Sequence, residues 1–288
     1  MTSGTQTACA LVLCFDLCRP EHRERIARDL AENLGRHGNR LTTGFIGTPY
    51  LCQALSENGL HDLAGKLLRN GEYPGWLREV KLGATTIWER WDSMHDDGSF
   101  DESGMNSFNH YAFGAIGTWM VEYLAGIRAA SPGYREILLK PGMIQGLTHV
   151  RATRKTPYGT LSCAWKCKNG EITVDVTIPA NTTAVLYLPE RSEPVSLGSG
   201  SWHYAYPTET CLEPRRFTMD IRMGELAENE TAVRLLEEAM PGAGQMLRMA
   251  FLREKTLREL IPMSPPGAEA MYQGILDRLN QMPEPDTV

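Results

Sequence analysis

LTHVRATRKTPYGTLSCAWKCKNGEITVDVTIPANTTAVLYL, residues 147–188 of this 288-residue chain, marks a change from helical to strand-like patterning. Apolar and polar residues alternate along it, which is typical of strands that bury one face. Turn sequences interrupt the alternation after each short run. Antiparallel strands at this spacing predict a β-sandwich domain over residues 132–206. The expected strands are 147–153, 160–166, 171–178 and 183–188.

The residues before this stretch, 1–131, have apolar positions at helical spacing and are predicted to form a helical domain. Thr48 before Pro49 is a predicted N-cap, with proline at the first helical position. Ser107 is the predicted cap of a long last helix, which the sequence Ser131-Pro132-Gly133 ends. The expected helices are 5–17, 20–33, 48–59, 60–70 and 108–130.

The residues after the sandwich predict a third domain over 207–288. It begins with a linker that contains Pro207 and Pro214. Amphipathic patterns then predict a small helical unit. Its expected helices are 232–240, 246–261 and 267–282.

The composition restricts the possible partners. Hydrophobic residues make up 42% of the chain and charged residues 22%, as in ordinary globular proteins. A net charge of -6 argues against a nucleic-acid surface, which needs clustered Lys and Arg. The apolar run over residues 8–15 is too short to cross a bilayer. The seven cysteines are odd in number and indicate free thiols in a reducing compartment, so we expect a cytoplasmic protein.

The segments most typical of a catalytic or binding site are GATTIWERWD (83–92) and MNSFNHY (105–111). A carboxylate between two tryptophans, with an arginine beside it and a histidine further on, is the composition expected of a sugar site. Indole rings stack on sugars, while charged and amide groups bond their hydroxyls. The candidate site residues are Glu89, Trp88, Arg90, Trp91, Asn109 and His110.

The same residues also have structural interpretations. Thr86 and Glu89 are spaced as a capping box, so Glu89 could instead bond the backbone at a helix start. Arg90 could form a structural salt bridge, and His110 could be a satisfied core histidine. Trp88 and Trp91 would be neighbours on a helix, one in the core and one a sugar platform.

The acidic loop over residues 92–102 suggests a calcium site, but it departs from the EF-hand pattern. Ser93 and His95 stand where that pattern has Asp or Asn, and the closing acid is missing at the required spacing. We therefore expect a solvated turn or a lid beside the site. No metal and no cofactor are expected.

Several uncommon motifs resemble those of bacterial α-L-rhamnosidases of glycoside hydrolase family 78, in the family's order. The resemblance covers about the first 190 residues. It implies an (α/α)6 barrel that cleaves terminal α-L-rhamnose with inversion, followed by a β-sandwich and here a small helical appendage. Glu89 then resembles the general base, and His110 a ligand of a sugar hydroxyl or of water. The motifs are LTTGFIGTPY (41–50), ALSENG (54–59), YPGW (73–76), GATTIWERWD (83–92), residues 105–114 and LLKP (138–141).

The resemblance also implies that the general acid lies on an upstream segment that residues 1–288 do not contain. A partial barrel would expose inner faces that are meant to be buried. We therefore expect the isolated chain to be inactive, and to self-associate or to require a partner that supplies the N-terminal half. Two alternatives remain. One is another inverting hydrolase or lyase acting on uronic or deoxy sugars, and the other is a non-catalytic carbohydrate-binding remnant.

Overall fold

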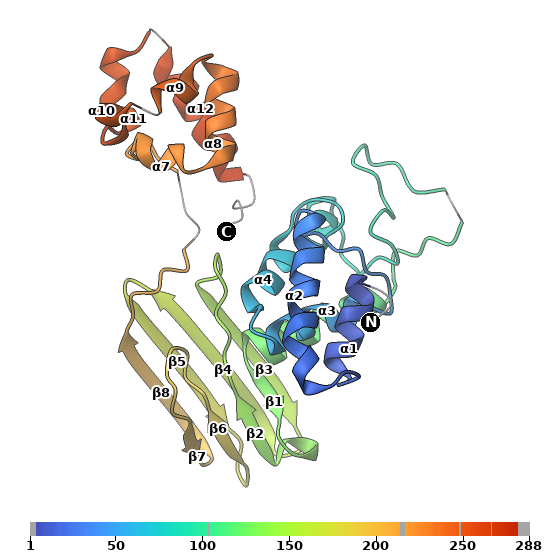
Figure 1. The fold of residues 1–288 in the computed structure, drawn as a ribbon. Coiled ribbons are helices and arrows are strands. Elements are labelled where there is room, and N and C mark those ends of the chain that lie inside the picture. Colours follow the sequence, from blue (N-terminus) through green and yellow to red (C-terminus); the bar gives the residue numbers. More distant parts are fainter. Residues whose placement is uncertain (1–3, 103, 214–216, 248, 266, 282–288) are drawn as a thin grey trace. The chain divides into compact units, whose positions relative to one another are not determined.

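The computed structural model describes residues 4–102, 104–213, 217–247, 249–265 and 267–281. The chain forms two compact units, residues 1–213 and residues 214–288 (Figure 1). The first unit contains the helical region and both sheets, and the regular elements described in the second unit are helices. No helix in the described residues is long and apolar enough to span a bilayer.

The helices of the first unit pack around a core of leucines. α3 contacts both α1 and α4 (Figure 1). Leu30, Leu51 and Leu55 are fully buried there, since apolar residues at helical spacing face one side of each helix. These helices are α1 (Gln6–Cys14), α2 (Pro20–Arg36), α3 (Thr48–Glu57), α4 (His61–Arg69) and α5 (Trp76–Lys81).

The predicted cap of α3 is wrong by one residue. Gly47 is the N-cap, and Thr48 is the first helical residue. The Thr48 hydroxyl lies 2.8 Å from the hydroxyl of Thr43, so it is engaged across the preceding turn. A side chain at position 47 would lie 2.4 Å from the Thr7 hydroxyl oxygen, which explains the glycine.

The predicted long helix over residues 108–130 is also wrong. The segment over residues 107–111 forms hydrogen bonds with the loop over residues 86–89. The helical part after it is short and passes from 3-10 to α to π hydrogen bonding. Gly126 ends it with a φ of 78°, and a side chain there would lie 2.1 Å from the Lys140 carbonyl carbon. The elements are η1 (Ala112–Ala115), α6 (Ile116–Trp119), η2 (Met120–Leu124), which is a π-helix, and then β1 (Ile127–Ala129).

Two sheets follow and form the expected sandwich. The larger sheet is antiparallel, in the order β3-β4-β5-β8 (Figure 1). The second sheet has the order β1-β2-β6-β7, and β2 and β6 run parallel within it. A short helix, η3 (Pro132–Tyr134), precedes β2. The strands are β2 (Glu136–Leu139), β3 (His149–Thr156), β4 (Gly159–Lys168), β5 (Glu171–Ile178), β6 (Thr183–Leu186), β7 (Val195–Leu197) and β8 (Gly200–Pro207).

Trp165 connects the sandwich to the helical region. Its ring is buried, and its Nε1–H donates to the Leu124 carbonyl oxygen at 2.8 Å. The Gly142 N–H donates to the same oxygen at 3.2 Å, so two donors satisfy a carbonyl at the end of η2, where the helix no longer provides a partner.

The second unit is a bundle of short helices. The helix predicted over residues 246–261 is wrong, because Thr256 and Glu259 form a capping box that starts a new helix. The helix predicted to reach Met282 is described as far as Gln281, and Met282 lies outside the described residues. The elements are α7 (Met223–Ala227), α8 (Glu230–Ala239), α9 (Ala243–Met246), α10 (Ala250–Arg253), α11 (Leu257–Leu260), η4 (Ile261–Met263) and α12 (Ala268–Gln281).

Candidate active site

The loop that carries Glu89 pairs with the segment that carries His110. The Glu89 N–H donates to the Ser107 carbonyl oxygen at 2.9 Å, and the His110 N–H donates to the Ile87 carbonyl oxygen at 2.8 Å. The Thr86 hydroxyl donates to the carbonyl of Phe108. These bonds bring two predicted site residues, 21 positions apart (110 − 89), onto adjacent strands of chain.

The Glu89 carboxylate is half-buried, and it is not a helix cap. No helix begins at Thr86. Glu89 Oε2 instead accepts the Ser107 N–H at 2.8 Å. The capping-box interpretation is therefore wrong, because both side chains bond a distant segment. This bond fixes the direction of the Glu89 side chain.

Arg90 organises the acidic loop. Its guanidinium pairs with Asp92 at 2.9 Å and with Asp101 at 3.2 Å. It thereby connects the two ends of the loop over residues 92–102. No group of three or more His, Cys, Asp or Glu side chains is placed to hold a metal ion within the part of the chain that the structure describes.

The two tryptophans are both core residues and do not share a helix. Trp88 is 3% exposed and Trp91 is 9% exposed. Trp91 stacks on Phe113, with ring centroids 4.0 Å apart and planes 7° apart, and meets the edge of Trp76. Trp88 meets Phe108 edge to face at 5.2 Å. Little ring surface of either tryptophan is therefore exposed for the predicted stacking on a sugar.

His110 lies in the middle of a stack of three rings. Its centroid is 4.7 Å from that of Phe45 and 5.2 Å from that of Tyr111, each with planes 12° apart. Phe45 is exposed and Tyr111 is 87% exposed. Asn109 is exposed beside them. The motifs contained Phe45 and Tyr111, but nothing in the sequence indicated that they flank the imidazole.

The hydrogen bonding of His110 assigns its tautomer. Nδ1 accepts the Ala112 N–H at 3.3 Å. A neutral imidazole with Nδ1 as acceptor carries its proton on Nε2. His110 therefore offers a donor at Nε2, which is the atom suited to bond an oxygen of a sugar or of water.

Arg78 on α5 supports the same loop from within. Its side chain is buried, and it donates to the carbonyl oxygens of Trp91 and Met94, both at 3.0 Å. It also pairs with Asp96 at 2.7 Å. Sequence reasoning missed this residue, because its partners lie 13 to 18 positions away.

Glu79, the next residue, carries a buried carboxyl near the Glu89 loop. It is 3% exposed, and it accepts a backbone hydrogen bond from Trp88. Desolvation by burial raises the pKa of Glu79 to about 7, while the Trp88 bond and Arg78 oppose the rise. Its Oε1 has no hydrogen-bond partner among the described residues.

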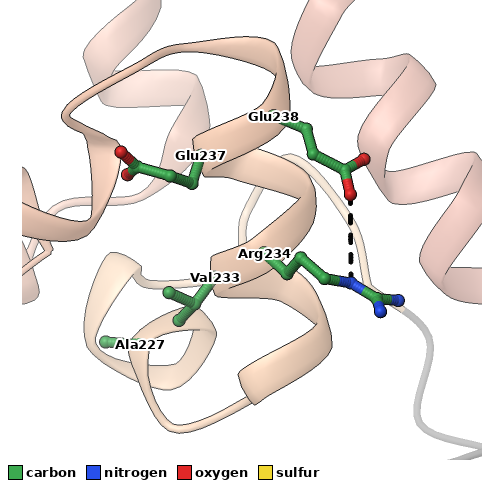
Figure 2. A pocket seen from close by; sticks show the side chains of 5 residues that line it. All are labelled: Ala227, Val233, Arg234, Glu237 and Glu238. Atoms are coloured by element: carbon green, nitrogen blue, oxygen red, sulfur yellow. Dashed lines mark ion pairs between the residues drawn. The ribbon is translucent and has the colours of Figure 1, made fainter.

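The second unit has a shallow groove lined by Ala227, Val233, Arg234, Glu237 and Glu238 (Figure 2). Arg234 and Glu238 form an ion pair at 4.0 Å, drawn as the dashed line in Figure 2. The Glu237 carboxylate accepts the N–H groups of Gly242 and Gly244 at 2.8 and 2.7 Å. These charged groups stabilise α8 and the turn after it.

Comparison with known proteins assigns the two parts of the first unit. Residues 1–124 match the bacterial alpha-L-rhamnosidase 6 hairpin glycosidase domain, which makes this region a glycosidase domain by class. Residues 126–201 match the bacterial alpha-L-rhamnosidase C-terminal domain. Residues 1–124 and 126–201 therefore belong to domain families of bacterial alpha-L-rhamnosidases.

Individual relatives agree with this assignment. An alpha-L-rhamnosidase from Formosa agariphila is 44% identical over 65% of this chain and 20% of its own length. The crystal structure of the Streptomyces avermitilis alpha-L-rhamnosidase complexed with L-rhamnose is 34% identical, with a TM-score of 0.68 over 70% of this chain and 22% of that one. The Aspergillus terreus enzyme gives a TM-score of 0.70 at 36% identity, over 74% and 25%. The chain thus spans about a fifth of the length of the curated relatives it matches.

Proposed function

We propose that this chain is the base-carrying part of an α-L-rhamnosidase that hydrolyses terminal α-L-rhamnose with inversion. The observation that supports this most is the pairing of the Glu89 and His110 segments, with the Glu89 carboxylate held by the Ser107 N–H at 2.8 Å. Such a carboxylate can take a proton from an attacking water. The substrates would be rhamnose-containing glycosides.

The neighbouring groups suit binding of a deoxy sugar. The ring faces of exposed Phe45 and Tyr111 offer apolar contact, and His110 Nε2–H offers a hydrogen bond. We therefore assign sugar contact to this ring stack and to exposed Asn109. Arg90 serves by holding the acidic loop in place.

We propose that the general acid comes from outside these residues. Inversion needs two carboxyl groups roughly 6.5 to 9.5 Å apart, so that water fits between the base and the sugar. Of the nearby acids, Asp92 and Asp101 bind Arg90 and Asp96 binds Arg78. Glu79 is 3% exposed, which is too buried for its carboxyl to protonate a glycosidic oxygen. The isolated 288 residues are then expected to release no rhamnose.

A chimera tests this function directly. Residues 1–201 would replace the matching segment of the Streptomyces avermitilis enzyme, which would supply the rest of the barrel. The chimera should hydrolyse an aryl α-L-rhamnoside, and proton NMR of the first product should show β-L-rhamnose. A folded chimera that is inactive on rhamnosides but active on aryl uronides, or one that releases α-L-rhamnose first, would contradict the proposal.

We also infer a reducing, cytoplasmic location. All seven cysteines are free thiols. Burial raises the pKa of Cys52 to about 12 and that of Cys163 to about 12, so these two are inert apolar side chains.

Self-association, or a partner that supplies the remaining barrel, is a further part of the proposal. Large apolar side chains are exposed on the helical region, and contiguous apolar surface favours association. Among them are Phe15, Leu17, Ile46, Val80, Phe100 and Met105.

A further inference from the structure

The β3–β4 hairpin lies in a stretch of unusual charge. Residues 137–170 contain no Asp or Glu and carry six Lys or Arg. The whole chain has a net charge of -6, so the other residues sum to -12 (−6 − 6). Positive charge is therefore concentrated in one local segment of an acidic protein.

The strand register places much of this charge on one face. β3 is the edge strand and pairs with β4 (Figure 1). Val150 and its partner Trp165 face the core, so the alternate residues face outward. The outward-facing cations of the two strands are Arg151, Lys155, Lys166 and Lys168, with His149 beside Lys166.

The other two cations of the segment are already engaged. The Arg154 guanidinium lies 4.8 Å from the Tyr134 ring centroid, and the Lys140 ammonium lies 5.8 Å from that of Tyr187. The four outward-facing cations are exposed and make no ion pair within the described ranges. β5, the strand beside β4, carries two outward-facing acids. Asp175 pairs with His203 at 2.7 Å, and Glu171 lies opposite Lys168 in the strand register.

The rest of this face is polar. A row of hydroxyl side chains crosses the four strands in register, at Thr153, Ser162, Thr177 and Ser201. Small side chains, Ala164 and Ala205, separate the charged positions, and no Phe, Tyr or Trp of these strands points outward. The surface therefore offers four cations and a row of hydroxyls beside two acids, Glu171 and Asp175, without a stacking platform.

We propose that this outer face of the β3-β4-β5-β8 sheet binds an acidic polysaccharide, through its carboxylate or sulfate groups. Arg151 and Lys155 are separated by about 13 Å along the strand and Lys166 and Lys168 by about 7 Å, at about 3.3 Å per residue. This spacing suits a polymer with charges set apart by sugar units, which the hydroxyl row can also bond. Duplex DNA carries a charge every ~1.7 Å and would meet the repulsion of the remaining acidic surface.

Binding of polygalacturonate to the full 288-residue chain tests the proposal. Binding should weaken steeply between low and high salt, because counterions compete for exposed cations. The variant Arg151→Gln/Lys155→Gln/Lys166→Gln/Lys168→Gln should lose at least tenfold in affinity, and Lys166→Gln/Lys168→Gln about threefold. Fully methyl-esterified polygalacturonate, which has the same backbone without charge, should not bind.

A charge-matched control removes four cations from the helical region, in Arg19→Gln/Arg25→Gln/Arg28→Gln/Arg36→Gln. This control should bind polygalacturonate with the affinity of the unmodified chain. All variants should have the same midpoint of urea unfolding as the unmodified chain. Equal loss in both quadruple variants would mean that net charge alone matters, and would overturn the proposal. So would unchanged binding by the sheet variants, absence of binding by the unmodified chain, or tighter binding to duplex DNA.

Discussion

Glu89 and Ser107 are joined by two hydrogen bonds, one through the Glu89 backbone and one through its side chain. The Glu89 N–H donates to the Ser107 carbonyl at 2.9 Å, and the Ser107 N–H donates to the Glu89 carboxylate at 2.8 Å. A carboxylate held in this way has a defined direction before any ligand arrives. Preorganisation of this kind lowers the cost of reaching a productive geometry.

Glu79 should make stability depend on pH. Folding raises the pKa of Glu79 from 4.5 to about 7, so the folded chain binds a proton that the unfolded chain has released. Stability should be unaffected by this group below pH 4.5, fall as the pH rises towards about 7, and level off above. Urea unfolding should show that the free energy of unfolding falls from pH 5 to pH 8. This fall should be smaller for Glu79→Gln than for the unmodified chain, by on the order of 3 kcal/mol.

The amide in Glu79→Gln can still accept the Trp88 N–H, so the comparison isolates the charge. Glu32→Gln, at an exposed position on α2, is the control and should leave the pH dependence unchanged. Parallel pH profiles for Glu79→Gln and the unmodified chain would show that the Glu79 carboxyl is not the cause.

Arg78→Met should destabilise the first unit. The substitution keeps an apolar stem but leaves the carbonyl oxygens of Trp91 and Met94 without their donor. Leaving buried acceptors unpaired costs about 1–3 kcal/mol each. Urea unfolding should therefore show a loss of about 2–4 kcal/mol, and proteolysis within residues 92–102 should become faster. The control Arg25→Met, at an exposed position of α2, should change neither the free energy of unfolding nor the rate of proteolysis. An Arg78→Met chain with unchanged stability would contradict the role of Arg78 in supporting this loop.

His110→Phe separates ring stacking from hydrogen bonding. Phenylalanine keeps the contact with Phe45 but removes the Nε2–H donor. In the chimera, kcat/KM for an aryl rhamnoside should fall about tenfold, as for the loss of one hydrogen bond to the sugar. Phenylalanine also removes the Nδ1 acceptor of the Ala112 N–H, so stability should fall by about 1 kcal/mol. A His110→Phe chimera with unaltered kcat/KM would remove His110 from the sugar site.

Trp165→Phe should weaken the link between the sandwich and the helical region. It deletes the bond from Nε1 to the Leu124 carbonyl oxygen at 2.8 Å in a buried setting. The expected loss is about 0.5–1.5 kcal/mol by urea unfolding, because the Leu124 carbonyl oxygen still accepts the Gly142 N–H at 3.2 Å. Trp202→Phe is the matched control, because its Nε1 bonds the Gly198 carbonyl at 3.1 Å on an exposed strand. Equal losses for the two variants would contradict the special role of Trp165.

The sandwich could be predicted from the sequence because its signals are local. Asn169 and Gly170 have positive φ angles, at 54° and 73°, as the predicted turn requires. Alternation along Leu161, Cys163 and Trp165 places each of them in the core. Period-two patterns and turn residues are read within a few positions of each other.

The helical region was harder to predict because its decisive contacts are distant in sequence. Thr86 and Glu89 have capping-box spacing, but both bond residues 107–108. The apolar positions after residue 112 continue a helical period, yet Gly126 must approach Lys140, and the helix ends there. No local pattern shows such partners. The buried pair Arg78 and Glu79 was missed for the same reason.

The most direct measurement is kcat of the chimera with and without the Glu89 carboxylate. Glu89→Gln keeps an acceptor for the Ser107 N–H but removes the base, so kcat on an aryl rhamnoside should fall by about 10²–10⁴ with little change in KM. Glu102→Gln, an exposed carboxyl in the neighbouring loop, should leave kcat within about twofold, in keeping with a residue outside the chemistry. A Glu89→Gln chimera that retains its kcat would contradict the assignment of Glu89 as the general base.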